Sequence, residues 1–166
     1  MKSTEMLELL REFHRDKFAM RARHVAAARY VSDYDFNNTY QYVIAREDMH
    51  VRWLTDAIVD LQGQPDESTP PAIEFSGKAA AAQRSALQGD SDAAEAFIAN
   101  WRPRIDTLPN ARHRTMLNVI LGETLEHKRF FDLALAGRTD LLGRRADGAG
   151  TGGGVMKARW VGDITK

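Results

Sequence analysis

Five side chains in two short segments have residue types that bind metal ions. Glu47 and His50 stand three positions apart in REDMHV, and Glu123, Glu126 and His127 stand together in GETLEHKRFF. Residues three or four apart in a helix lie on the same face, so each segment directs carboxylate and imidazole groups to one side. Carboxylates balance the charge of metal ions and can bridge two of them, and neutral imidazole completes a mixed set suited to iron or manganese. Both segments therefore predict metal binding.

Both segments also lie in apolar stripes that are predicted to face a protein core. Apolar residues recur at helical spacing over residues 40–61, and Glu47 stands within that stripe, where leucine or isoleucine would be usual. The stripe over residues 116–134 has Glu123 and His127 among its members. Because a carboxylate directed into a core is costly unless something neutralises it, we expect a bound metal to do so.

Helical spacing and capping signals predict an all-α fold, a four-helix bundle. The first helix starts at Ser3 with an acidic first turn. Asn38 and Gln41 resemble a capping box at the start of the second helix, and Gly63 is the signal for its end. Asn110 can cap the last helix. The predicted helices span residues 3–31, 38–63, 91–106 and 110–137.

A long connection separates the second predicted helix from the third. Its first part, QPDESTPP, has the composition of a loop, and the alanine-rich KAAAAQRSALQ predicts a short helix of its own. A crossover of this length allows the third helix to run parallel to the second, which is a known bundle topology. Pro103 is expected to bend or end the third helix.

The chain divides into a bundle domain, residues 1–142, and a glycine-rich C-terminal tail, residues 143–166. ADGAGTGGG has the composition of a flexible linker, and VMKARWVGDITK beyond it is too short to fold alone. Its apolar residues leave docking onto the bundle or onto a neighbouring subunit as an alternative.

Composition narrows the classes of partner and cofactor. Lys plus Arg and Asp plus Glu each total 23, so the zero net charge gives no argument for nucleic acid or an anionic membrane as a partner. The chain has no cysteine, which excludes disulfides and cysteine-ligated iron–sulfur clusters. It shows neither a signal peptide nor a stretch long enough to span a bilayer, so we expect a cytoplasmic protein.

In helix order, long crossover and paired carboxylate–histidine segments, the chain resembles the ferritin-like superfamily, of the rubrerythrin and bacterioferritin kind. The resemblance covers residues 3–137. It implies that Glu47 and Glu123 bridge two metal ions and that His50 is a ligand. It also implies that either His127 or Glu126 fills the equivalent position on the last helix, one residue away from a strict Glu-x-x-His motif.

The same resemblance implies one further ligand from each of the first and third helices. The first helix offers Glu12, His14 or Asp16, and the third offers Asp90, Asp92 or Glu95. Two iron or manganese ions held this way would react with dioxygen or peroxide, in an oxidoreductase or an iron-handling protein. The tail offers no packed terminal helix, so a monomer or homodimer is expected in preference to a storage cage.

Two other interpretations remain open. The chain is also similar to DinB-like bundles, in which His50, His127 and a third histidine such as His14 would hold a single metal for transferase chemistry. Alternatively, it is a metal-free scaffold or dimerisation module, in which Glu47 and His50 pair with Arg21 or His24 as a buried polar network. Taken singly, His24 and His113 are expected at the surface or at a helix cap.

Overall fold

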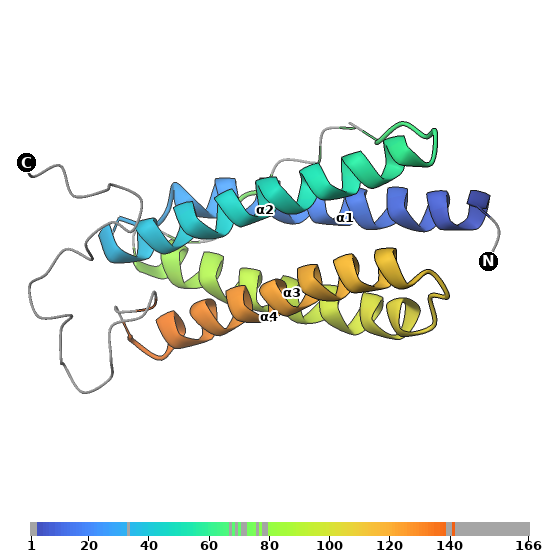
Figure 1. Ribbon diagram of the computed structural model, residues 1–166. Coiled ribbons are helices and arrows are strands. Elements are labelled where there is room, and N and C mark those ends of the chain that lie inside the picture. The colour runs from blue at the N-terminus through green and yellow to red at the C-terminus, as the bar shows by residue number, and fades with distance from the viewer. Residues whose placement is uncertain are drawn as a thin grey trace, which may run out of the picture.

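The structure is a computed structural model, and its four helices pack as a bundle (Figure 1). It describes residues 3–32, 34–66, 68, 70, 73–75, 77, 80–138 and 141. The helices are α1 (Ser3–Ala28), α2 (Tyr34–Asp60), α3 (Ala80–Asp106) and α4 (Ala111–Leu135). No strand occurs among the described residues. The predicted all-α, four-helix fold is therefore confirmed.

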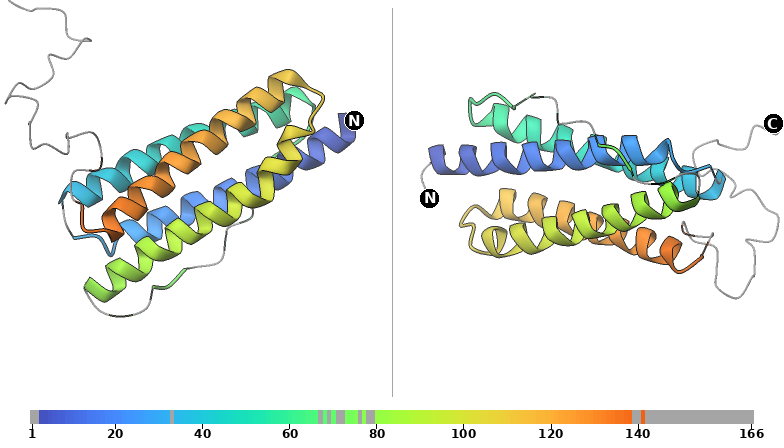
Figure 2. Two further views of the ribbon diagram at one scale, coloured as in Figure 1. Left: turned by 90° about the horizontal axis from the view of Figure 1, so that it is seen from below. Right: turned by 180° about the vertical axis from the view of Figure 1, so that it is seen from behind.

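The helices form two antiparallel pairs, α1 with α2 and α3 with α4, and the pairs pack through α1 on α3 and α2 on α4. Figures 1 and 2 show that α2 and α3 begin at one end of the bundle, whereas α1 and α4 begin at the other. Helix segments that are far apart in the sequence therefore lie side by side in the middle of the bundle. The connection over residues 61–79 includes positions outside the described residues, as does the predicted tail after residue 142.

The start of α3 differs from the prediction. The alanine-rich segment does not form a separate short helix; from Ala80 onward it is the first part of α3, which continues through Pro103 to Asp106. Ala86, Leu87 and Asp90 are buried there, so packing against the other helices extends the helix across a glycine. The residue types of Gly89 and Ser91 favour a helix that starts near residue 91. Burial against the other helices outweighs this local preference, so α3 starts earlier.

The end of α2 also differs in detail. Gly63 N–H donates to the Ile58 carbonyl (2.9 Å) and Gln62 N–H to the Val59 carbonyl (2.8 Å), which is a Schellman motif. The left-handed residue is Gln62, with φ of 60°, and not the predicted glycine. Glycine is favoured at residue 63 for another reason, because a Cβ there would overlap with Cδ1 of Leu7 and would force that side chain to move. The helix itself begins at Tyr34, earlier than the predicted capping box.

The limits of α4 agree with the prediction. The Asn110 side chain accepts a hydrogen bond from His113 N–H at 3.0 Å and caps the first turn. Gly137, with φ of 84°, takes the left-handed position after the last turn. His113 belongs to this capping region, but its side chain is buried and not at the surface.

Two apolar clusters fill the bundle and leave a polar layer between them. One lies towards the N-terminus of α1 and includes Phe13, Leu54 and Trp101. The other lies towards the C-terminus of α1 and includes Val43 and Phe131. Between these two clusters, the middle of the bundle contains buried charged and imidazole groups. None of the described helices is long and apolar enough to cross a membrane.

Candidate functional site

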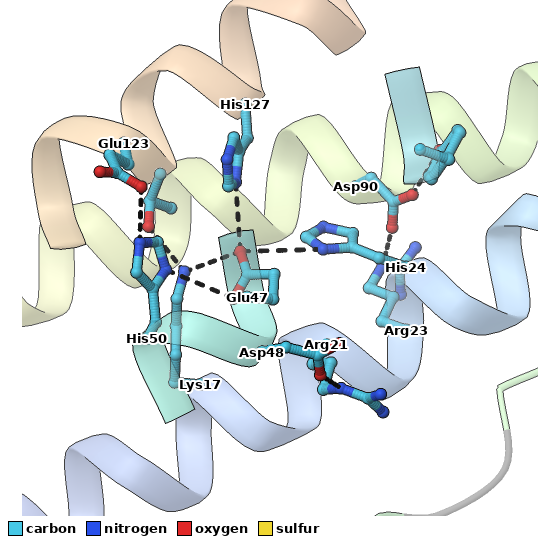
Figure 3. Close-up of polar contacts among 12 residues, drawn as sticks. Lys17, Arg21, Arg23, His24, Glu47, Asp48, His50, Asp90, Glu123 and His127 are labelled. Carbon is cyan, nitrogen blue, oxygen red and sulfur yellow. Dashed lines mark hydrogen bonds and ion pairs between the residues drawn. The ribbon is translucent and has the colours of Figure 1, made fainter. Parts of the chain in front are cut away.

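Glu47 is the centre of the buried polar layer. Its side chain is fully buried, and Lys17, which is equally buried, donates from Nζ to Glu47 Oε1 at 2.9 Å (Figure 3). His127 Nδ1 lies 3.1 Å from the same oxygen. Lys17 also donates to the hydroxyl of Thr124 at 2.7 Å, and that hydroxyl donates to the Ile120 carbonyl. The carboxylate is therefore held by α1 and α4 although it belongs to α2.

Three fully buried imidazoles surround this carboxylate, one from each of α1, α2 and α4. His24 Nδ1 lies 3.9 Å from Glu47 Oε1, and His50 Nδ1 lies 3.9 Å from Glu47 Oε2. Together with His127, they converge on Glu47 in Figure 3. The four side chains present two kinds of metal-binding atom, carboxylate oxygen and imidazole nitrogen.

Several of these atoms have no hydrogen-bond partner among the described residues. The five atoms are Nδ1 and Nε2 of His24, Nδ1 of His50, Nε2 of His127 and Oε2 of Glu47. Buried polar atoms are normally hydrogen-bonded, so each exception calls for bound water, an ion or a role in function. Five such atoms in one layer make it the most polar and least satisfied part of the described core.

The spacing of these atoms is somewhat wider than that of ligands around one ion. With tetrahedral bonds of about 2.0–2.2 Å, neighbouring ligand atoms lie roughly 3.3–3.6 Å apart. The nitrogen–oxygen distances from the three imidazoles to Glu47 are 3.1, 3.9 and 3.9 Å. In the part of the chain that the structure describes, however, no three His, Cys, Asp or Glu side chains stand ready to hold a metal. The Lys17 ammonium group sits beside Glu47 instead.

The electrostatics of the layer favour an ionised Glu47 and neutral rings of His24 and His127. Burial raises the pKa of Glu47, but the charge of Lys17, the hydrogen bond from His127 and the nearby His50 ring outweigh it, so the pKa is well below its usual value. Burial lowers the pKa of Lys17, opposed by the attraction of Glu47. Burial also lowers the pKa of His24 and of His127. Neutral imidazole is the form that can bind a metal.

Glu123 connects the buried layer to the surface. His50 Nε2 lies 2.8 Å from Glu123 Oε2, and Arg46 binds both carboxylate oxygens at 2.8 and 2.5 Å. The Glu123 side chain is 24% exposed. Burial raises its pKa, but the hydrogen bonds from Arg46 and His50 outweigh that effect and lower it. Glu123 therefore orients His50 from outside the centre and does not bridge to Glu47.

The remaining predicted ligands lie elsewhere. Glu126 and Glu95 are exposed and line an outer groove of about 770 Å³ between α3 and α4. His14 is buried, but its Nε2 lies 3.2 Å from the Thr55 hydroxyl and its ring stacks on Phe18. The structure thus brings together Glu47, His50 and His127 of the predicted set, and holds Glu123 at the edge.

The other carboxylates considered on α1 and α3 have partners of their own. Glu12 pairs with Arg104, and Asp16 accepts a hydrogen bond from the Trp101 indole at 3.0 Å. Asp90 is fully buried, and both its oxygens accept hydrogen bonds of 2.6 Å, from Tyr40 and from Arg23. Asp92 accepts a bond from Gln88.

Three residues of the centre are absent from the predicted ligand set: Lys17, His24 and Thr124. Taken singly, His24 was expected at the surface or a cap, and its complete burial contradicts that prediction. Its position 3.9 Å from Glu47 agrees with the buried polar network of the metal-free alternative. Lys17 and His24 are seven residues apart, which places them on one face of α1. Thr124 stands three residues before His127, the same spacing as Glu47 to His50. Counting back three positions from His127 would have identified it, whereas the search for a carboxylate selected Glu123.

The residues present fit a two-metal carboxylate centre poorly. Such centres take one Glu from each of two helices and Glu-x-x-His from each of the other two. Here α2 supplies Glu47 and His50, but α4 supplies Thr124 with His127, and α1 supplies the cation Lys17. One carboxylate with three imidazoles is instead the composition of a site for a single ion.

Neither the scan against protein-family models nor the search of curated proteins returns a match for this chain.

Proposed function

We propose that this chain is a metal-binding four-helix bundle of the ferritin-like kind that binds one divalent transition-metal ion. Its ligands are His24, His50, His127 and Glu47. The observation that supports this function is the ring of three buried imidazoles, with unpartnered nitrogens, around a buried ionised carboxylate. A nitrogen-rich set of this kind suits iron(II) or zinc better than manganese.

The arrangement of the helices agrees with this proposal. Because α2 and α3 begin at the same end of the bundle (Figures 1 and 2), we infer that the connection between them crosses its length. Bundles with one such crossover include the ferritin-like proteins, which build metal sites from side chains on facing helices. The DinB-like alternative also has a single ion. Here His24 is the third histidine ligand, whereas that alternative takes His14.

The chain's own residues would position and shield the ion. Glu47 and the imidazoles bind it, Glu123 orients His50 from the surface side, and the apolar clusters above and below exclude water. Bound iron would supply a redox centre in this layer, with dioxygen or peroxide as reactants small enough to enter a closed bundle.

Elemental analysis tests the proposal directly. The full chain, produced with added iron, manganese and zinc, is expected to contain about one ion per chain, since a bound ion would satisfy buried atoms that lack hydrogen-bond partners. His24→Asn and Glu47→Gln should each lose the ion. His113→Asn is the matched control, because His113 is buried with an unpartnered Nδ1 but lies at the start of α4. Metal-free wild-type protein from every medium would reject the proposal.

A second function has one observation in its favour. The ammonium of Lys17 already neutralises Glu47, with hydrogen bonds of 2.9 Å to that carboxylate and 2.7 Å to Thr124. Under this alternative the bundle is a metal-free scaffold with a permanent internal ion pair. The same elemental analysis separates the two functions, because the scaffold would bind no metal in any variant.

A further inference from the structure

We propose that Lys17 is an internal competitor for the metal position, so that an ion binds at Glu47 only by displacing the lysine ammonium group. The inference rests on the proposed function and adds a residue that controls affinity. It starts from the position of Nζ, which lies 2.9 Å from Glu47 Oε1 and is bounded on its other side by Thr124.

Distances place the ammonium group where an ion would bind. Lys17 Nζ and His127 Nδ1 both contact the same oxygen, at 2.9 and 3.1 Å, and His24 Nδ1 approaches that oxygen at 3.9 Å. An ion bound to Oε1 and to these imidazoles would lie against the ammonium group, because its bonds would be only about 2.0–2.2 Å long. The two cations cannot share the space.

Charge leads to the same conclusion. The carboxylate of Glu47 and the ammonium group of Lys17 form a buried ion pair with no net charge. A divalent ion added beside the ammonium group would leave two uncompensated positive charges in a layer without solvent. Glu123, which contacts the layer through His50, is already paired with Arg46. Removing the lysine charge from this position halves the excess positive charge. Metal binding at Glu47 and the presence of the Lys17 ammonium group there therefore oppose each other.

The lysine also explains why the ligands are not closed around a point. Lys17 holds Glu47 towards α1 and Thr124, while His24 and His50 stay 3.9 Å from the carboxylate. Withdrawal of Nζ would free Oε1 and allow the imidazoles to approach. Phe97, whose ring centre lies 5.0 Å from Nζ, bounds the ammonium group from α3, so the side chain has to move away from that ring.

Metal affinity of lysine variants tests the inference. Chelator-treated full-length protein is titrated with Co²⁺, followed by its visible absorption, and with Zn²⁺ in competition with a chromophoric chelator. Lys17→Met should bind each ion at least about tenfold more tightly than wild type, and Lys17→Arg should bind no more tightly, because it retains the charge. Lys128→Met is the matched control, since Lys128 pairs with Asp132 at the surface of α4.

A second measurement uses the wild-type protein, in case Lys17→Met does not fold. In protein labelled with ¹³C at lysine, one equivalent of Zn²⁺ should shift the Cε resonance of Lys17 and leave that of Lys128 in place. Zinc binding with an unmoved Lys17 resonance would overturn the inference, as would equal or weaker affinity in a folded Lys17→Met. Both of these outcomes leave the proposed function intact. Absence of binding in wild type and in folded Lys17→Met would reject the proposed function itself.

Discussion

Removing Lys17 and Glu47 singly and together would show how strongly the middle of the bundle depends on one ion pair. The variants are Lys17→Met, Glu47→Leu and the double substitution. Both side chains are fully buried, and they are joined by a 2.9 Å hydrogen bond. Each single change leaves one buried charge without its counterion, which costs about 3–5 kcal/mol, whereas replacing the whole pair with apolar residues is often neutral or stabilising.

The structure sets limits on these values. In Glu47→Leu the stranded lysine can release its proton, and this costs at most about 1.36 × (10.4 − 7) ≈ 4.6 kcal/mol at pH 7. The single variant should therefore lose no more than about 5 kcal/mol from that source. In the double variant His127 loses its bond to Glu47 and Thr124 its bond to Lys17. At roughly 1 kcal/mol for each hydrogen bond, the double variant should stay within about 2 kcal/mol of wild type.

Urea unfolding followed by circular dichroism, with chelator present, measures the free energy of unfolding for all four proteins. The expected coupling energy exceeds about 3 kcal/mol, and each single variant should melt roughly 6–20 °C lower than wild type. The control pair is Arg112→Met with Asp60→Leu, an exposed ion pair of 3.3 Å, whose removal should cost less than about 1 kcal/mol. If the two buried changes add to within about 0.5 kcal/mol, the ion pair does not organise this layer and the reasoning is refuted.

Four further predictions concern two glycine positions and the buried polar groups. Gly63→Ala should lower the free energy of unfolding by about 1–3 kcal/mol, because the added Cβ has no room beside Leu7. Gly122→Ala, whose Cβ meets open space within α4, should raise the free energy of unfolding by about 0.5–1 kcal/mol in the same urea assay. Tyr40→Phe leaves one oxygen of buried Asp90 without its 2.6 Å hydrogen bond and should cost about 1–3 kcal/mol by urea unfolding. Burial lowers the folded-state pKa of His24, so below about pH 6.5 protons bind the unfolded chain preferentially and the stability of metal-free protein should fall. A pH series of unfolding curves should show a shallower fall for His24→Asn, and an unchanged slope would contradict the assignment.

The fold was predictable because its signals are local and repeated. Long stretches without glycine or proline, apolar stripes and an Asn cap at residue 110 predict the helices. The error at the start of α3 arose where a tertiary contact decides. Gly89 and Asp90 read as a helix start, but Asp90 is buried and bonded to Tyr40 and Arg23, and these partners come from α2 and α1. No pattern within α3 itself contains that information.

The site was predictable only in part, for a related reason. Glu47 and His50 were found because a carboxylate in an apolar stripe is anomalous within its own helix. Which residue of α4 faces it depends on the rotation of that helix, and one position amounts to about 100°. The choice of Glu123 over Thr124 followed residue chemistry, and the packing selects Thr124. Lys17 was missed because a lysine on a helix normally reaches solvent.

The polar layer is expected to lower the stability of the bundle, and this cost bears on function. The layer lies between two apolar clusters, and buried apolar residues of equal volume would be cheaper there than an ion pair with five unpartnered atoms. A scaffold needs only the apolar arrangement, since stability is its sole requirement. A cation at Glu47 would bind a carboxylate oxygen and one nitrogen from each neighbouring imidazole, and would recover part of the energy that the metal-free layer forgoes. The unsatisfied atoms, more than the carboxylates at the surface, are therefore what favours a binding function over a purely structural one.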